Sequence, residues 1–338
     1  MAKKHRKPEF YSRFMEKGFF PDANKNTKYH ESHNYWAFKT GQKIYKVKKH
    51  EEAKSTASLE EIFCQETMRR ILNHSPALNP VIATIKEDQQ SFQLDLDNQI
   101  SSPPLYFVII MDQLADRYFL NNVISKGKLT EKILNSVSHF LFQLHENASP
   151  TSSKDEGTSE SILQKLNDLI YQSKKYLGDT ISQPMIDMTL RPLEKYIVDN
   201  RKLLLRRNKR GLIREVHGCF IPRKIYAGKE NVLALAKTTD PLRNRYCDVV
   251  SDIADLTVEL RQEGETDKAV YFIDSYCKET EDREIKQVLP IYQALKCLSQ
   301  GLKYSILFKQ GGEKSAEEEN KTKAASYYEQ AIEVVHQL

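Results

Sequence analysis

The sequence predicts an α+β fold with two lobes: a small antiparallel β lobe with one helix, then a large, mainly helical lobe. β-rich runs dominate residues 35–111, whereas from residue 121 onward the apolar residues recur with helical spacing. The chain has 338 residues, more than one hydrophobic core usually supports. We therefore divide it into a basic lead-in (1–32), a small lobe (33–115) and a large lobe (116–338).

The small lobe begins with a predicted β-hairpin. Gly41-Gln42 separates its two strands, and this two-residue spacing is typical of a tight turn. A helix follows, because Ser58 and Glu61 form a capping box ahead of apolar residues at helical spacing. Three later apolar runs complete a predicted sheet of five strands (35–40, 43–48, 81–85, 92–96 and 105–111). A hinge is expected at 112–115.

The large lobe is predicted to be a series of helices. The first three cover 129–146, 161–176 and 185–207, and the Ser/Thr-rich segment 149–161 is expected to be a loop. Short β-like runs then interrupt the helical pattern (220–221, 224–226 and 232–236). Amphipathic helices fill the remainder from residue 248 to the end.

Composition excludes several classes of protein. The 51 Lys and Arg are nearly balanced by 46 Asp and Glu, so bulk charge makes no case for nucleic acid as a partner. No run approaches the 18 apolar residues that cross a bilayer, and no apolar segment follows the basic first seven residues as in a secretory signal. The five cysteines contain no CxxC pair. We expect a cytoplasmic protein without membrane contact, disulfides or a zinc site.

Five short strings carry a resemblance to known motifs (IYKVKK at 44–49, CQE at 64–66, FQLH at 142–145, GLIREVHG at 211–218 and RYCDVVSD at 245–252). In this order they resemble the kinase-like domain of the aminoglycoside-phosphotransferase superfamily. The likeness is greatest to the amino-terminal half of bacterial proteins that join such a domain to a P-loop ATPase. The resemblance covers the chain from about residue 35 onward and implies a protein-kinase-like fold. No GxxxxGK[ST] motif of the ATPase half occurs in this sequence.

The resemblance places three catalytic positions of that superfamily within residues 217–252. The loop HGCFIPRK at 217–224 is similar to the HGDxxxxN motif, but Cys219 stands at the catalytic aspartate and Lys224 at the metal-binding asparagine. The superfamily's spacing back from Asp248 puts Ala236 at the second metal-binding aspartate. Asp240 is an alternative ligand if the loop is re-routed, although two threonines and Pro241 around it are typical of a turn.

These replacements remove the groups that phosphoryl transfer needs. The reaction requires a carboxylate to position the acceptor hydroxyl and oxygen ligands to hold Mg²⁺ against the phosphates. A thiol is a poor substitute for a carboxylate base, and a lysine adds charge of the wrong sign at a metal position. We therefore expect no intact catalytic residue and no metal site.

The small lobe retains the residues that resemble the superfamily's nucleotide site. Glu66 follows Ile62 and Phe63 on the apolar face of its helix, where a lone carboxylate is costly without a cation. The resemblance predicts that Lys48, or Lys46 on the same strand face, is that cation and binds nucleotide. In the alternative interpretation, the lysines form a solvent-facing strand edge and Glu66 lies at the rim of the core.

The remaining candidate residues have structural interpretations. His145 and His217 match superfamily positions, but a histidine that ends a helix or opens a loop often holds backbone by hydrogen bonds. Asp248 and Asp252 are expected to cap a helix and support the large lobe.

Cys219 has a second interpretation as a nucleophile. His217 would serve as its base, and Arg223 and Lys224 would supply an electropositive setting. An inert loop cysteine is the simpler explanation.

Two functions from different classes are consistent with this sequence. The first is a catalytically inactive kinase-like module, a pseudokinase, that binds an unknown protein or small molecule in the cleft between its lobes. The second is an atypical ATP-dependent phosphotransferase or nucleotide transferase with replacement ligands. The loss of three separate positions favours the first. No cofactor is certain from the sequence; the one that the small lobe suggests is ATP bound without Mg²⁺.

Overall fold

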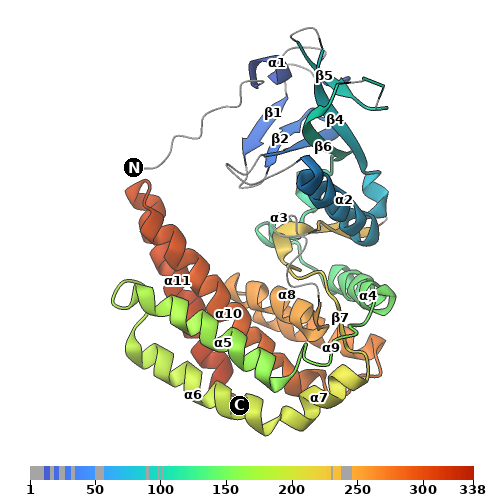
Figure 1. The fold of residues 1–338 in the computed structure, drawn as a ribbon. Helices are drawn as coiled ribbons and strands as arrows, with labels where there is room; N and C mark the ends of the chain where they lie inside the picture. The colour runs from blue at the N-terminus through green and yellow to red at the C-terminus, as the bar shows by residue number, and fades with distance from the viewer. Residues whose placement is uncertain are drawn as a thin grey trace. The chain divides into compact units, whose positions relative to one another are not determined.

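The computed structural model has two compact units, drawn as a ribbon in Figure 1. The smaller unit comprises residues 3–119 and 233–243, and the larger comprises 1–2, 120–232 and 244–338. The α+β fold class predicted from the sequence is confirmed, since an antiparallel sheet forms the first unit and helices dominate the second. The residues that the structure describes are 11–15, 19–22, 27–31, 35–49, 57–88, 91–97, 99–100, 102–229, 231–236 and 246–338.

The small unit contains a sheet of six strands in the order β1-β2-β3-β6-β4-β5, with every neighbouring pair antiparallel. Five of them correspond to the five predicted strands. The additional strand, β1, has the polar sequence KYHE, which carries no apolar alternation and so gave no strand signal. The strands are β1 (Lys28–Glu31), β2 (Tyr35–Lys39), β3 (Lys43–Lys48), β4 (Val81–Asp88), β5 (Ser91–Asp95) and β6 (Pro104–Asp112).

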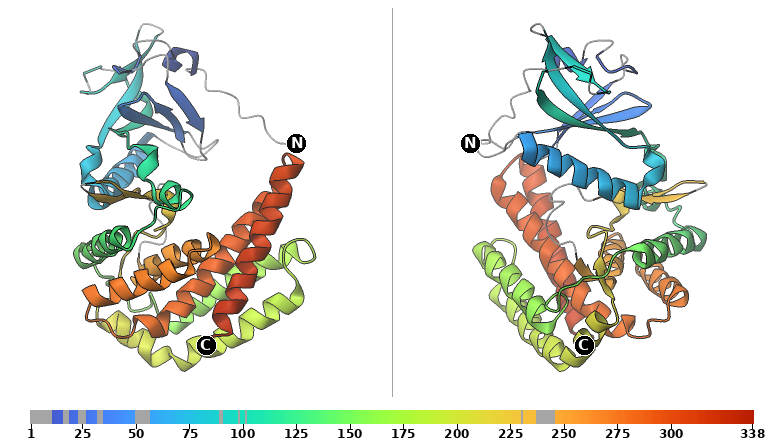
Figure 2. Two further views of the ribbon diagram at one scale, coloured as in Figure 1. Left: turned by 180° about the vertical axis from the view of Figure 1, so that it is seen from behind. Right: turned by 45° about the vertical axis from the view of Figure 1, so that its right-hand side comes forward.

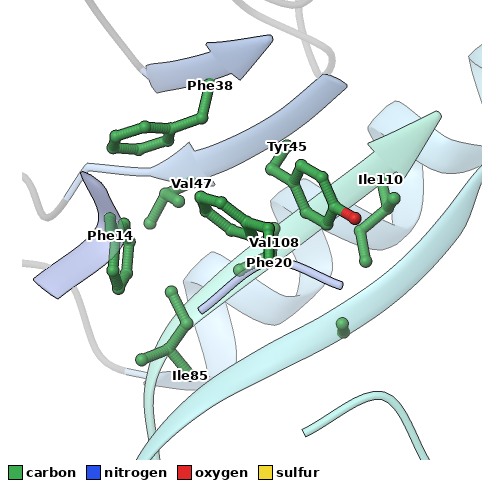
Figure 3. Close-up of a cluster of buried hydrophobic side chains, with 9 residues drawn as sticks. Phe14, Phe20, Phe38, Tyr45, Val47, Ile85, Val108 and Ile110 are labelled. Atoms are coloured by element: carbon green, nitrogen blue, oxygen red, sulfur yellow. The ribbon is translucent and has the colours of Figure 1, made fainter. Parts of the chain in front are cut away.

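The two faces of this sheet are covered by different parts of the chain. Helix α2 (Ala57–His74) packs on one face against β6 and β4, and Figure 2 shows it lying along the sheet. Phe14 and Phe20 cover the other face, where they are fully buried among side chains of β2, β3, β4 and β6 (Figure 3). Phe14 belongs to the short helix α1 (Tyr11–Met15).

The burial of these aromatic side chains corrects the expectation of a loosely packed lead-in. A strand alternates its side chains between two faces, so the apolar residues on the side opposite α2 also need a cover. The aromatic residues near the amino terminus supply it, with Phe20 stacked on Tyr45 at 4.1 Å between ring centroids.

The large unit is built mainly from helices. Their starts follow the sequence: Thr130, Thr158 and Ser182 each accept a hydrogen bond from a backbone N–H of the following helix. The single helix predicted over 185–207 is divided at Asn200, whose side chain donates to the Tyr196 carbonyl at 2.9 Å. The helices are α3 (Leu120–Ile124), α4 (Glu131–Asn147), α5 (Ser159–Ser173), α6 (Gln183–Asp199), α7 (Arg201–Lys209), α8 (Val250–Gln262), α9 (Thr266–Glu279), α10 (Ile285–Gln310) and α11 (Lys314–Val335).

Helices α10 and α11 lie side by side along most of their length (Figure 1). Their close approach depends on Gly301, because a Cβ there would lie 2.7 Å from the ring of Tyr328. Among the described helices, none is long and apolar enough to cross a membrane.

Four short strands interrupt the helices. β7 (Ile213–Glu215) pairs antiparallel with β10 (Tyr246–Asp248), and β8 (Ile225–Ala227) forms a sheet with β9 (Val232–Ala234). The strand expected at 220–221 is wrong: these residues lie in a loop before the 3-10 turn Pro222–Lys224. The β7–β10 pairing brings the start of α8 beside this loop.

Candidate functional site

The candidate site in the large unit is built around residues 217–224, here called the 217–224 loop. It follows β7, whose Ile213 pairs with Asp248 of β10, so the chain enters α8 next to the loop. Helix α8 presents Asp252 and Asp255 one turn apart on the side that meets the loop.

Asp252 holds the beginning of the loop through backbone hydrogen bonds. Its carboxylate is fully buried and accepts from the N–H groups of His217 and Gly218, both at 2.8 Å. It also contacts Nε2 of His145 at 3.1 Å. Because a carboxylate only accepts, His145 Nε2 must carry a proton, and Nδ1 lies 2.7 Å from the hydroxyl of Tyr276. Burial alone would raise the pKa of Asp252, but the bond from His145, the positive charges of His145 and His217, and the Gly218 N–H hold it below its usual value.

Asp255 holds the next part of the loop. It accepts from the N–H of Phe220 at 2.9 Å and forms an ion pair with Lys296 of α10 at 2.7 Å. Burial lowers the pKa of Lys296, but the charge of Asp255 outweighs burial and raises it. The loop backbone is therefore fixed by two carboxylates of α8, and the second of these is tied to α10.

A buried ion cluster lies behind the start of α8. The guanidinium of Arg207 binds both oxygens of Asp248, at 2.6 and 2.9 Å, and Asp282 at 2.6 Å. All three side chains are almost completely shielded from solvent. Asp248 also accepts from the N–H of Val250 at 3.0 Å, so it caps the helix start as expected and in addition anchors α7.

The structure places the predicted catalytic positions as follows. Cys219 and Lys224 are half-buried residues of the 217–224 loop, and Arg223 of the same loop is exposed. Ala236 is buried in the segment that belongs to the small unit, where Ser75 donates to the Ala234 carbonyl at 2.8 Å. The grouping of Ala236 with Cys219 and Lys224 stays a prediction.

Asp240, the alternative metal ligand, lies outside the described residues. Within the described residues, no group of three or more His, Cys, Asp or Glu side chains is arranged to hold a metal ion.

The small unit carries the predicted nucleotide residues around Phe63. Lys48 is buried on the α2 side of the sheet, with Nζ 4.5 Å from the centre of the Phe63 ring and 3.1 Å from the Lys49 carbonyl. Glu66 lies one turn beyond Phe63 and forms a two-pronged ion pair with Arg69 at 2.8 and 3.0 Å. Lys46 is half-buried on the same strand face as Lys48. The Lys–Glu pair stays a prediction, and in the structure Arg69 neutralises Glu66.

Sequence reasoning missed Arg207, Asp255 and Lys296. The signal for Lys296 is a charge inside the apolar run ALKCL, and the signal for Asp255 is its position three residues after Asp252 in IADL. Arg207 gave no such signal, because it is one of several basic residues in LLLRRNKR.

Comparison with solved structures identifies the fold. A choline/ethanolamine kinase family protein from Mesorhizobium loti superimposes with a TM-score of 0.53 at 9% sequence identity, over 93% of this chain and 94% of that chain. Aminoglycoside 2'-phosphotransferase-IIIa, in its GDP complex, gives a TM-score of 0.53 at 10% identity over 95% and 98%. A thermostable mutant of aminoglycoside phosphotransferase APH(4)-Ia, bound to AMP-PNP and hygromycin B, gives 0.53 at 11% over 90% and 94%.

These likenesses confirm the fold that the motif order implied. The chain has the protein-kinase-like fold seen in aminoglycoside phosphotransferases and choline/ethanolamine kinases. No family model matches its sequence.

Curated relatives match only part of the chain. The uncharacterized protein Rv2004c of Mycobacterium tuberculosis is 21% identical over 212 residues, and the uncharacterized protein Mb2027c of Mycobacterium bovis matches equally. The match covers 62% of this chain but 42% of the relatives' length, so this chain corresponds to less than half of them.

Proposed function

We propose that this chain is a catalytically inactive kinase-like domain that binds a ligand or partner without transferring a phosphoryl group. The observation that supports it is the contrast within the 217–224 loop. Asp252 and Asp255 fix the loop backbone with hydrogen bonds at 2.8–2.9 Å, while the two positions that resemble the catalytic motif carry Cys219 and Lys224.

Chemistry explains why a retained scaffold with these replacements favours binding over catalysis. Transfer of a γ-phosphoryl group depends on positioning and on neutralising the phosphate charge with Mg²⁺. Neither a thiol nor an ammonium group supplies the hard oxygen ligands that Mg²⁺ requires. The backbone of the loop does not depend on those side chains, because it is held from α8, so the fold persists without the reaction.

The small unit is the proposed place for a nucleotide. Lys48 already lies on the side of α2 that carries Glu66, and its ammonium group has only a carbonyl and an aromatic ring as partners within the described residues. A phosphate oxygen is a stronger partner for a buried ammonium than either of these. We therefore propose that ATP, if it binds, does so through Lys48 without Mg²⁺.

The competing function is an active phosphotransferase with replacement ligands. It is favoured by the names of the structural neighbours, which include phosphotransferases and kinases. Asp240 is the residue in this chain that would supply a metal ligand.

A turnover assay beside a binding assay separates the two functions. The protein is incubated with γ-labelled ATP and Mg²⁺ or Mn²⁺, with an aminoglycoside, ethanolamine or choline as acceptor, and ATP binding is followed by thermal shift. We expect no transfer with any acceptor, and any binding should be independent of metal and weakened by Lys48→Met. Metal-dependent transfer that Asp240→Ala abolishes would establish the competing function instead.

A further inference from the structure

One side of α10 in the large unit carries a stripe of polar side chains toward α8. Lys296, Gln300 and Lys303 are spaced by four and three residues, which places them on one helix face over successive turns. On α8, Asp255 and Glu259 are likewise one turn apart. The two helices pack against each other, so the stripes meet.

The first two turns of this contact are neutralised. Lys296 pairs with Asp255 at 2.7 Å. Gln300 donates to Glu259, which also accepts from the hydroxyl of Tyr327 at 3.2 Å.

The pairing ends at the third turn. There α8 presents Gln262, an amide already bonded to Gln330 and Ser326 of α11. Lys303 consequently has no carboxylate within 4 Å in the part of the chain that the structure describes. Its Nζ lies 4.5 Å from the centre of the Tyr304 ring.

Lys303 is half-buried in positive surroundings. Burial and the charge of Arg223 lower its pKa, outweighing the opposing effect of Glu259. Lys323 of α11 lies over the same Tyr304 ring at 5.6 Å. A partly buried ammonium group without a counter-charge is unfavourable in the free protein, and an anion would relieve that cost.

We propose that the Lys303 patch, formed by Arg223, Lys303, Tyr304 and Lys323, binds the phosphate groups of a small molecule. This inference deepens the proposed function, on which it rests, because it names the ligand class that the non-catalytic module binds. All four residues belong to the large unit.

The Tyr304 ring argues for recognition of phosphate and not of a nucleobase. It is stacked on Tyr327 at 5.6 Å with an interplanar angle of 9°, and it carries two ammonium groups. The ring therefore supports the lysines and is not free to stack on a base. A nucleic acid strand, by contrast, is recognised by free aromatic faces along a longer basic groove.

The test is calorimetric titration of the full chain with inorganic tripolyphosphate. Wild type is compared with Lys303→Gln and with Lys195→Gln, a matched control that removes one positive charge from an exposed pair with Asp199 on α6. Loss of one charge-assisted contact weakens binding about tenfold or more, so Lys303→Gln should show that loss. The control should bind as wild type does, and Lys303→Arg should retain most of the affinity.

Melting without ligand keeps the test independent of misfolding. Lys303→Gln removes a half-buried charge that has no acidic partner, so it should melt no lower than wild type. Equal affinity in all variants, or no binding to wild type, would overturn the proposal. So would binding of a single-stranded oligonucleotide, but not of tripolyphosphate, that depends on Lys303. Phosphoryl transfer in the turnover assay bears on the proposed function alone and leaves a Lys303-dependent phosphate site standing.

Discussion

Replacing Asp252 with asparagine should destabilise the protein strongly, because that carboxylate holds the start of the 217–224 loop. One oxygen accepts from the N–H of His217 and from Nε2 of His145, and the other accepts from the N–H of Gly218. In either orientation of an asparagine amide, its NH₂ group would face one of these donors. One buried donor is then left unpaired and the others lose a charged acceptor.

The expected cost follows from these three contacts. A hydrogen bond to a charged group contributes about 1.5–3 kcal/mol, compared with about 1 kcal/mol for a neutral one, and a buried unpaired donor costs about 1–3 kcal/mol. We expect Asp252→Asn to lower the free energy of unfolding by about 3–5 kcal/mol. For a domain of 150–250 residues this corresponds to a fall in Tm of roughly 6–20 °C. The control, Asp199→Asn, removes an exposed ion pair and should cost less than about 1 kcal/mol.

The effect should depend on pH with a definite sign. The pKa of Asp252 is lowered in the folded protein, so its contribution is complete above the unfolded pKa of about 4 and is lost as the pH falls through the folded pKa. Thermal melting at pH 7 and at pH 3 measures this, and the difference between wild type and Asp252→Asn should shrink at the lower pH. Hydrogen exchange should show the amides of His217 and Gly218 protected in wild type only. Equal Tm values at pH 7, or a difference that persists unchanged in acid, would refute the reasoning.

Three further substitutions test the packing, each by chemical denaturation. Arg207→Ala leaves the carboxylates of Asp248 and Asp282 buried without their cation and should cost about 3–5 kcal/mol; a cost below 1 kcal/mol would contradict the buried cluster. Phe20→Ala should cost about 3–5 kcal/mol because its side chain is fully buried; a surface-like cost would restore the loose lead-in. Gly301→Ala pushes a methyl group against α11 and should cost about 1–3 kcal/mol, whereas a neutral result would show that the helices separate easily.

The small sheet was predictable because its strands are apolar and bounded by turn residues. Four runs begin within one residue of the observed strands, and the fifth, expected from residue 81, begins there. β1 escaped because its side chains are polar, and its place is fixed by the register of β2, with Lys28 opposite Lys39. An edge strand of this kind is specified by its partner and not by its own pattern.

The candidate site was predictable only where the resemblance supplied positions. It directed attention to Cys219, Lys224 and Asp252, but it gave no account of how the loop is held. That account depends on contacts between residues far apart in the sequence, such as Asp255 with Lys296. Spacing along a chain cannot show such pairs, because any of several charges at helical positions would satisfy the same pattern.

A single-turnover experiment tests the absence of catalysis most directly. The protein is placed in excess over γ-labelled ATP with Mg²⁺, so that one transfer per protein molecule is detectable, and label is followed into water, acceptor and the protein itself. The account predicts that all label stays on ATP at the uncatalysed rate. Transfer faster than the protein-free control, abolished by Asp240→Ala, would contradict it and show an active site.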